Sequence, residues 1–232
     1  MMPTSQHRLS NVLFNGLSST IKLYDKLGLR VISTARPFSF YRKVFFNNRS
    51  EVAILADLRG KTVVDIGCGL TPFTEDSMFQ ACRRHGIAFY GVDPKLKQGF
   101  KFGMVDSLWS TFTGARNAPR ENMPGQDKAI GTYADQLPFD DASVDIVLSS
   151  WLLFVWLQDP KVLAAIFTEF DRVLKPGGRI SFYPSMRWQD MTTKYPFLLD
   201  VLKGYRSEQQ FWTYVRTSSL PFAYTIHLTK EK

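Results

Sequence analysis

Two short segments of the sequence carry residues that could bind a nucleoside. Gly67 and Gly69 follow the apolar run Val63–Ile66, and Asp93 comes 24 residues after Gly69, at the end of a second apolar run. Glycines at such a turn let the backbone approach a ligand closely, beside the positive end of a following helix. An acidic side chain after the next strand can accept hydrogen bonds from ribose hydroxyls. Each signal alone also fits a tight turn, but together they predict a nucleoside site.

The sequence argues against a dinucleotide site, a disulfide framework and a metal site. A dinucleotide-binding fingerprint requires a third glycine at position 72, where this chain has Pro72, and this argues against NAD or FAD. The two cysteines cannot form a disulfide framework or a four-ligand zinc site, and the three histidines lack metal-ligand spacing. We therefore expect no metal.

The elements that must position the nucleoside site alternate between strands and helices. A helix is predicted from Thr71 and Pro72 to Gly86, and another from Asp159-Pro160 to Leu174. A further helix is expected near residues 195–203. The predicted strands cover residues 61–66, 88–92, 129–133, 143–149, 179–183, 210–217 and 222–229.

This order predicts an α/β fold, with a doubly wound and mostly parallel seven-stranded sheet closed by a C-terminal antiparallel hairpin. Ligands of such sheets bind outside the carboxyl ends of the strands. Two helices, over residues 9–33 and 39–57, are expected before the first strand, separated at Arg36-Pro37. We expect residues 1–58 to form a helical cap and residues 59–232 to form the ligand-binding domain.

Composition and charge limit the class of protein. The 232 residues are 44% hydrophobic and 22% charged, which is typical of a globular chain and excludes disorder. The sequence shows no signal peptide and no apolar stretch long enough to span a bilayer, so we expect a cytoplasmic protein that does not bind a membrane. The net charge is +8, and a marked excess of basic residues in the first 58 could face an anionic partner.

Four motifs, in order, resemble those of class I S-adenosylmethionine (SAM) dependent methyltransferases. The glycine-rich segment 63–69 is similar to their first motif, and Gly91-Val-Asp93 resembles their ribose-binding turn. The segment 134–148 resembles the adenine-contacting loop and fourth strand of the small-molecule branch, and 173–178 is similar to the turn before their fifth strand. The resemblance spans about residues 58–184 and implies a Rossmann-like SAM-binding fold.

The resemblance also implies roles for single residues. Asp93, with Pro94 beside it, would bind the ribose hydroxyls, and Asp65 would help to hold the ammonium group of SAM. The other residues implied to contact the cofactor are Gly67, Cys68, Gly69, Ala134, Asp135, Gln136 and Ser149.

The acceptor site must be assembled from residues that face the sulfonium. The candidate catalytic residues are Ser150, Trp151 and Tyr183, because all three lie at strand ends. The aromatic faces of Trp151 and Tyr183 could stabilise the sulfonium cation. Candidate substrate residues are Tyr41, Arg42, Phe154 and Arg187. No histidine lies in the motif loops, so no general base stands out.

Two features depart from the family's pattern, and a motif that other branches of the fold carry is absent. The third glycine of the first motif is replaced by Thr71, and the interval from Asp93 to Asp135 is longer than usual, which indicates an insertion at about residues 100–128 that could act as a lid. The motif that amine methyltransferases of nucleic acids and proteins carry after the fourth strand is absent, because the chain reads Ser149-Ser-Trp-Leu152.

These features predict SAM-dependent methyl transfer to a small-molecule acceptor in biosynthesis, with release of S-adenosylhomocysteine. Positioning of the reactants would supply most of the rate, because the sulfonium is already activated. One alternative is cleavage of another carbon–sulfur bond of SAM, by aminocarboxypropyl transfer or cyclisation, which releases methylthioadenosine. The other is a nucleic-acid-binding module that uses the basic N-terminus, but its basic residues are scattered over two amphipathic helices.

Overall fold

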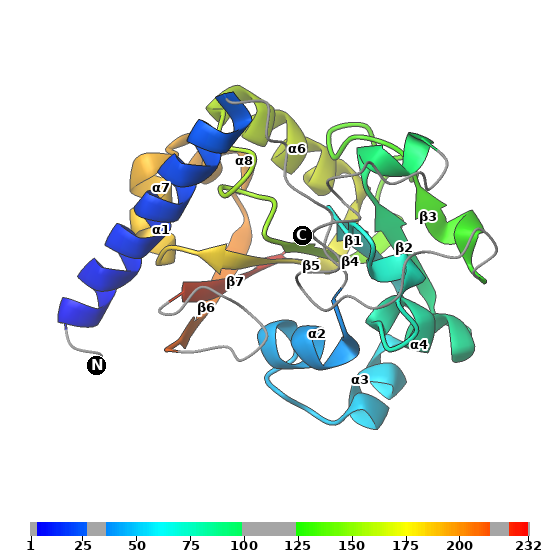
Figure 1. Cartoon of the computed structure of the whole chain (residues 1–232). Helices are drawn as coiled ribbons and strands as arrows, with labels where there is room; N and C mark the ends of the chain where they lie inside the picture. Colours follow the sequence, from blue (N-terminus) through cyan, green and yellow to red (C-terminus); the bar gives the residue numbers. More distant parts are fainter. Residues whose placement is uncertain (1–3, 27–35, 99–123, 214–222, 232) are drawn as a thin grey trace.

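A computed structural model describes residues 4–26, 36–98, 124–213 and 223–231 (Figure 1). Its centre is a sheet in the order β3-β2-β1-β4-β5-β7-β6. The strands are β1 Thr62–Ile66, β2 Ala88–Val92, β3 Ala129–Ile130, β4 Val144–Ser150, β5 Leu174–Ser185, β6 Tyr205–Trp212 and β7 Ala223–Lys230.

Strands β1 to β5 run parallel, and β7 lies antiparallel between β5 and β6. The prediction of a doubly wound, mostly parallel sheet of seven strands with an antiparallel C-terminal hairpin is thus confirmed. Because β1, β2, β4 and β5 are parallel neighbours, the residues that follow them gather at one edge of the sheet.

Helices cover both faces of the sheet. In Figure 1, α6 lies above the sheet, and α2, α3 and α4 lie below it. The helices are α1 Thr4–Lys26, α2 Phe38–Phe45, α3 Glu51–Leu58, α4 Met78–Arg84, α6 Pro160–Val173, α7 Trp188–Lys194 and α8 Phe197–Val201. Short 3₁₀ turns form at Thr71–Phe73, Pro94–Gln98 and Gln126–Lys128.

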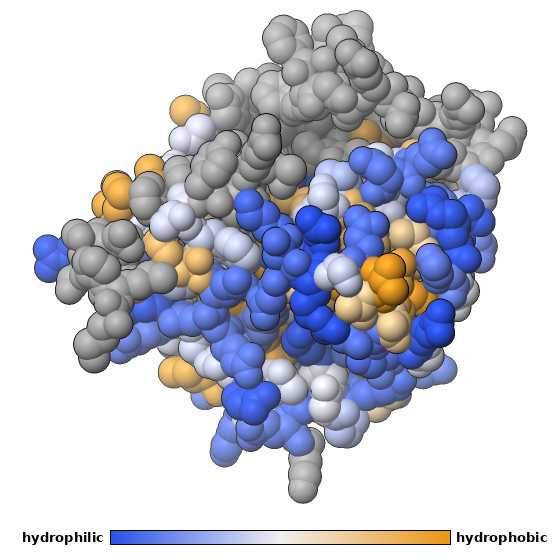
Figure 2. Space-filling view, turned by 90° about the horizontal axis from the view of Figure 1, so that it is seen from below, coloured by the Kyte–Doolittle hydropathy of each residue, from blue (hydrophilic) through white to orange (hydrophobic). Residues whose placement is uncertain are grey.

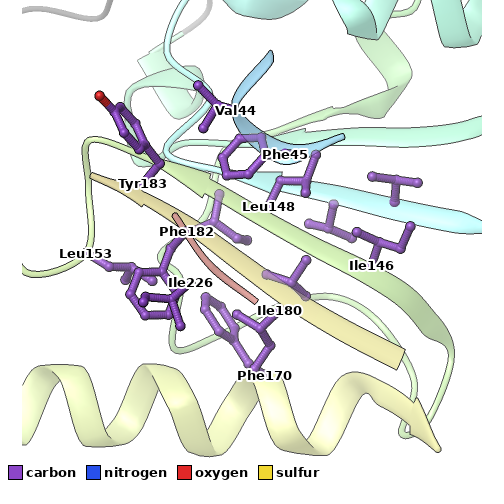
Figure 3. Packing of buried hydrophobic residues seen from close by; sticks show 14 of the residues in the cluster. Val44, Phe45, Ile146, Leu148, Leu153, Phe170, Ile180, Phe182, Tyr183 and Ile226 are labelled. Carbon is purple, nitrogen blue, oxygen red and sulfur yellow. The ribbon is translucent and has the colours of Figure 1, made fainter. Parts of the chain in front are cut away.

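The core is divided by the sheet into two layers. Figure 3 shows Val44 and Phe45 of α2 on one side of the strands, and Phe170 of α6 on the other. On β5 the alternation of a strand directs Phe182 towards α6 and Tyr183 towards α2 (Figure 3). Both rings are fully buried. Burial of a ring of this size contributes roughly 1.5–3 kcal/mol to folding.

The expected helix over 39–57 is wrong in one respect, because the chain forms two helices there. Asn47 and Asn48 adopt left-handed backbone angles, with φ of 51° and 56°, and end the first helix. Asparagine tolerates this conformation better than most residues. The Ser50 side chain then caps α3 by accepting a bond from the backbone N–H of Ala53. As a result the apolar side chain of Val52 is 79% exposed, although it would share the buried face of Tyr41, Val44 and Leu55 if the helix were continuous.

Other boundaries also differ from the expectations. The helix after the glycine loop does not begin at Thr71, where a 3₁₀ turn forms, but at Met78, with Ser77 as its cap. The predicted helix near 195–203 is present but shorter, as α8, and a further helix, α7, precedes it, with Pro196 between the two. Strand β3 is shorter than predicted, β5 is longer, and β6 begins at Tyr205 rather than Gln210. Residues 27–33 of the first predicted helix, and most of the insertion at 100–128, lie outside the described residues.

Helix α1 rests on the segment that follows β4 and on α7. The hydroxyl of Ser18 donates to the carbonyl of Phe154 at 3.3 Å, and Gln158 donates to the carbonyl of Ser18 at 2.9 Å. Asn11 donates to the Asp190 carboxylate of α7 at 3.0 Å. The surface on the opposite side of the sheet, seen from below in Figure 2, is largely hydrophilic. No helix in the described part of the chain combines the length and apolarity needed to cross a membrane.

Candidate cofactor and active site

The glycine loop is held against the end of β2 by backbone bonds. The N–H groups of Gly67 and Cys68 both donate to the carbonyl of Val92, at 2.8 and 3.3 Å. Gly67 and Gly69 have φ of 70° and 54°, a region that side chains other than glycine's strain to enter. A Cβ at position 67 would also come within 2.9 Å of Leu152, which follows β4. Both glycines are therefore required by the turn itself.

Asp93 lies against this loop as its spacing predicts. Its Oδ2 accepts a bond from the backbone N–H of Gly69 at 3.2 Å, and its Oδ1 accepts one from Lys95 at 3.0 Å. Pro94 is exposed and opens the turn that follows. The two halves of the predicted nucleoside site are thus joined by a direct hydrogen bond.

Asp65 lies one strand position before the loop and is only 1% exposed. The hydroxyl of Tyr41, from α2, donates to Oδ2 of Asp65 at 2.5 Å, while Oδ1 of Asp65 is buried and has no partner among the residues that the structure describes. Burial raises the pKa of Asp65 to about 7, although Tyr41 and the Arg36 guanidinium favour the charged form. Burial also raises the pKa of Tyr41 well above its usual value, so this hydroxyl stays protonated and serves as a donor.

Strand β3, which precedes the predicted adenine loop, brings that loop close to Asp93. The backbone N–H of Asp93 donates to the carbonyl of Ile130, and Asp135 and Gln136 are exposed in the turn beyond, with Ala134 partly buried. Glu169 and Arg172 of α6 hold the end of this turn.

Glu169 and Arg172 both hold this turn through the backbone of Leu137. The carboxylate of Glu169 accepts from the N–H of Leu137 at 2.7 Å, and Arg172 donates to the Leu137 carbonyl at 3.1 Å. The two side chains also pair with each other at 2.7 Å. Sequence reasoning missed both positioning residues, because only the fold brings α6 beside the loop.

The ends of β4 and β5 place three of the predicted catalytic residues side by side. The backbone N–H of Trp151 donates to the carbonyl of Tyr183 at 2.6 Å, and their rings meet edge to face with centroids 6.4 Å apart. Trp151 has a φ of 64°, which turns the chain sharply after Ser150. Ser149 and Ser150 are buried. Among the described residues, neither the Ser149 hydroxyl nor the Trp151 indole N–H has a hydrogen-bond partner, and both atoms are buried.

The predicted substrate residues do not gather at one place. Phe154 is a core residue, fully buried, with its ring 5.0–5.8 Å from those of Tyr195, Phe182 and Phe167, so a substrate role is not supported. Arg187 forms an ion pair with Asp190 of α7 at 2.9 Å.

The remaining two predicted substrate residues are both on α2. Tyr41 is buried against Asp65, where it cannot reach solvent. Arg42 is partly buried, and its Nε has no hydrogen-bond partner. The N-terminal segment therefore contributes to the site, mainly through the residues around Tyr41.

Arg36 is a member of the site that sequence reasoning used only as a helix break. Its backbone N–H donates to the hydroxyl of Thr71 in the glycine loop at 3.3 Å. Its guanidinium lies 4.7 Å from the ring centroid of Phe40 and 5.8 Å from that of Trp151. The Arg-Pro pair that indicated the break was the one signal in the sequence that marked this position.

Comparison with known families decides the identity of this site. Residues 64–182 match a family model described as a methyltransferase domain, and they make up half of the chain. The chain belongs to this methyltransferase family. Its cofactor is S-adenosyl-L-methionine, and the chain's residues fit that molecule: the glycine loop and Asp93 suit the nucleoside, and the orphaned Oδ1 of Asp65 suits an ammonium group.

One curated relative and two solved structures illustrate the family. Phosphoethanolamine N-methyltransferase 1 of Triticum aestivum is 32% identical over 133 residues, which cover 57% of this chain and 23% of that protein. The match thus spans about a quarter of the relative.

The solved structures are more distant. A SAM-dependent methyltransferase from Methanosarcina mazei is 17% identical with a TM-score of 0.48, over 76% of this chain and 96% of that one. Geranyl diphosphate C-methyltransferase from Streptomyces coelicolor is 18% identical with a TM-score of 0.43, over 78% of each chain. Likeness at this level does not bear on the acceptor.

Proposed function

We propose that this methyltransferase transfers the methyl group of SAM to a small-molecule acceptor and releases S-adenosylhomocysteine. The observation that carries the proposal is the bond between Asp93 and the N–H of Gly69, because it joins the two nucleoside-binding motifs beside the ends of β4 and β5. The wheat relative, named for a small phosphorylated amine, supports a small acceptor.

Each group at this edge has a distinct task in the proposed reaction. Asp93 would bind the ribose hydroxyls, residues 134–136 would border the adenine, and Asp65 would hold the ammonium group. Trp151 and Tyr183, whose rings meet at the ends of β4 and β5, would border the methyl group and exclude water from it. Holding the acceptor in line with the bond that breaks would account for most of the rate.

The N-terminal residues belong to the same proposed unit. We keep the division into a helical cap, 1–58, and a SAM-binding domain, 59–232, as part of the proposal. The contacts of α1 with the segment after β4, and of Tyr41 with Asp65, support a cap that completes the site. A cytoplasmic location and a role in biosynthesis remain predictions from the sequence.

The product distinguishes methyl transfer from cleavage of another carbon–sulfur bond. The purified protein would be incubated with SAM alone and with a panel of small amines, alcohols, thiols and carboxylates, and the products resolved by mass spectrometry. We expect S-adenosylhomocysteine that depends on one acceptor. Enzyme-dependent methylthioadenosine in the absence of acceptor would overturn the proposal in favour of cyclisation.

A further inference from the structure

Arg36 is fixed at the edge of the site by its own backbone. The bond from its N–H to the Thr71 hydroxyl ties it to the glycine loop, and Pro37 directly after it precedes α2. Its side chain is partly buried and extends between the rings of Phe40 and Trp151. Those rings adjoin Tyr183, at 6.1 Å from Phe40 and 6.4 Å from Trp151. The guanidinium therefore lies among the residues expected to face the reacting methyl group.

The charge of this guanidinium is not paired within the described residues. No carboxylate or carbonyl among the described residues accepts a hydrogen bond from it, and it lies over the rings of Phe40 and Trp151. Asp65 acts on it electrostatically, but Oδ2 of that carboxylate already accepts from Tyr41. Burial lowers the pKa of Arg36, yet an arginine remains protonated in proteins. The site thus holds a partly buried cation whose donors meet no hydrogen-bond acceptor among the described residues.

A second unused donor lies in the same wall. The indole N–H of Trp151 is buried and meets no acceptor in the described part of the chain, and its ring is one of the two that flank the guanidinium. A buried donor without a partner destabilises the folded protein unless a ligand supplies the acceptor. The planar fork of arginine matches the oxygens of carboxylate and phosphate, and stacking on rings orients it.

We propose that Arg36 binds an anionic group, a carboxylate or a phosphate, of a ligand at the carboxyl edge of the sheet. Two sources of this group are compatible with the reaction: the carboxylate of the cofactor and an anionic group of the acceptor. The inference rests on the proposed function for the identity of these ligands, but not for the binding of an anion.

Three probes and three variants test the proposal. Arg36→Met keeps an unbranched stem but removes the charge and the donors, whereas Arg36→Lys keeps the charge and loses the planar fork. Arg59→Met, at the exposed end of α3, is the matched control. Calorimetry would measure binding of S-adenosylhomocysteine, of methylthioadenosine, which lacks the carboxylate, and of inorganic phosphate with and without S-adenosylhomocysteine.

Two results support the proposal and assign the anion. If the cofactor carries the anionic group, Arg36→Met lowers the affinity for S-adenosylhomocysteine by at least about tenfold and leaves the affinity for methylthioadenosine unchanged. If the acceptor carries the anionic group, Arg36→Met binds both nucleosides with wild-type affinity but no longer binds phosphate. Arg36→Lys falls between wild type and Arg36→Met in either case.

Two other results overturn it. In the first, Arg36→Met binds all three probes with wild-type affinity. In the second, it loses affinity for both nucleosides equally, which would mean that Arg36 only supports the fold. Failure of the proposed function appears separately, because wild-type protein would then bind neither nucleoside, and phosphate binding to the free protein would still decide the role of Arg36.

Discussion

The glycine loop and the N-terminal segment build the same site in different ways. In the loop, Gly67, Gly69 and Asp93 are positioned by backbone bonds and backbone angles, which a short stretch of sequence encodes. In the segment before α3, Arg36 and Tyr41 depend on contacts with residues far away in the sequence: the Arg36 N–H donates to the Thr71 hydroxyl, and the Tyr41 hydroxyl donates to Asp65. The loop thus supplies a general nucleoside site, and the N-terminal segment supplies its buried charges and rings.

This difference predicts where changes act. Substitutions at the loop's ligand-facing carboxylate should affect binding more than folding, since it is partly exposed. Substitutions at the buried contacts of the N-terminal segment should affect folding more than binding, because a buried polar group without a partner costs stability. The four predictions below test this contrast, from the largest expected effect to the smallest.

The largest effect is expected in the pH dependence of stability through Asp65. Burial holds its pKa at about 7, well above the value in an unfolded chain. Between about pH 4 and 7 the unfolded state therefore loses a proton that the folded state keeps, and the free energy of unfolding falls by about 1.4 kcal/mol per pH unit. The stability from this proton is fully present below pH 4 and is lost as pH rises to 7.

Asp65→Asn removes this titration. Urea unfolding of wild type and variant across that range should show the wild type losing on the order of 4 kcal/mol relative to the variant. Asp200→Asn, on the exposed side of α8, should run parallel to wild type. Parallel curves for Asp65→Asn as well would show that this carboxyl is not held protonated by burial.

The second effect is the loss of cofactor affinity in Asp93→Ala. The change removes the acceptor for the ribose hydroxyls, and bonds to a charged group of this kind contribute about 2–3 kcal/mol. Calorimetry with S-adenosylhomocysteine should show that loss, with a much smaller change in the urea midpoint. Asp127→Ala, exposed after the insertion, serves as control. An unchanged affinity would remove Asp93 from the site.

Tyr41→Phe should show the opposite pattern. It leaves the buried carboxyl of Asp65 without its donor, and we expect a loss of about 1–2 kcal/mol in the free energy of unfolding. Affinity for S-adenosylhomocysteine should fall less than in Asp93→Ala. Tyr205→Phe, which removes a hydroxyl bonded to Asp171 on the hairpin side, is the matched control for stability. A loss of affinity without a loss of stability would contradict the contrast between the two regions.

The sequence could predict the part of this molecule that local patterns encode. The succession of strands and helices, the glycine turn and the place of Asp93 follow from short motifs and from alternation of elements. The break at Asn47 and Asn48 was missed because an apolar pattern at helical spacing continued across it. Arg36, Glu169 and Arg172 were missed because each acts on a segment that only tertiary packing brings near. Phe154, a predicted substrate residue, packs among core rings, and the sequence could not show this because a ring after β4 can turn towards either layer.

The smallest effects are expected at the two serine caps, one in each region. Ser77 caps α4 directly after the glycine loop and is fully buried, whereas Ser50 caps α3 and is exposed. Replacement by alanine removes one bond to a backbone N–H, which typically costs about 1 kcal/mol. Ser77→Ala should cost more than Ser50→Ala, because solvent can reach the freed N–H of α3 but not that of α4.

The same pair tests whether the glycine loop depends on the helix that follows it. Gln80, whose N–H the Ser77 hydroxyl accepts, also donates through its side chain to the carbonyl of Pro72 at 2.7 Å. Loss of the cap at the start of α4 would therefore weaken the bond between Gln80 and Pro72, which holds the end of the glycine loop. We expect Ser77→Ala to weaken S-adenosylhomocysteine slightly and Ser50→Ala to leave it unchanged in the same titration. Equal affinities for both variants would show that the loop is held by the end of β2 alone.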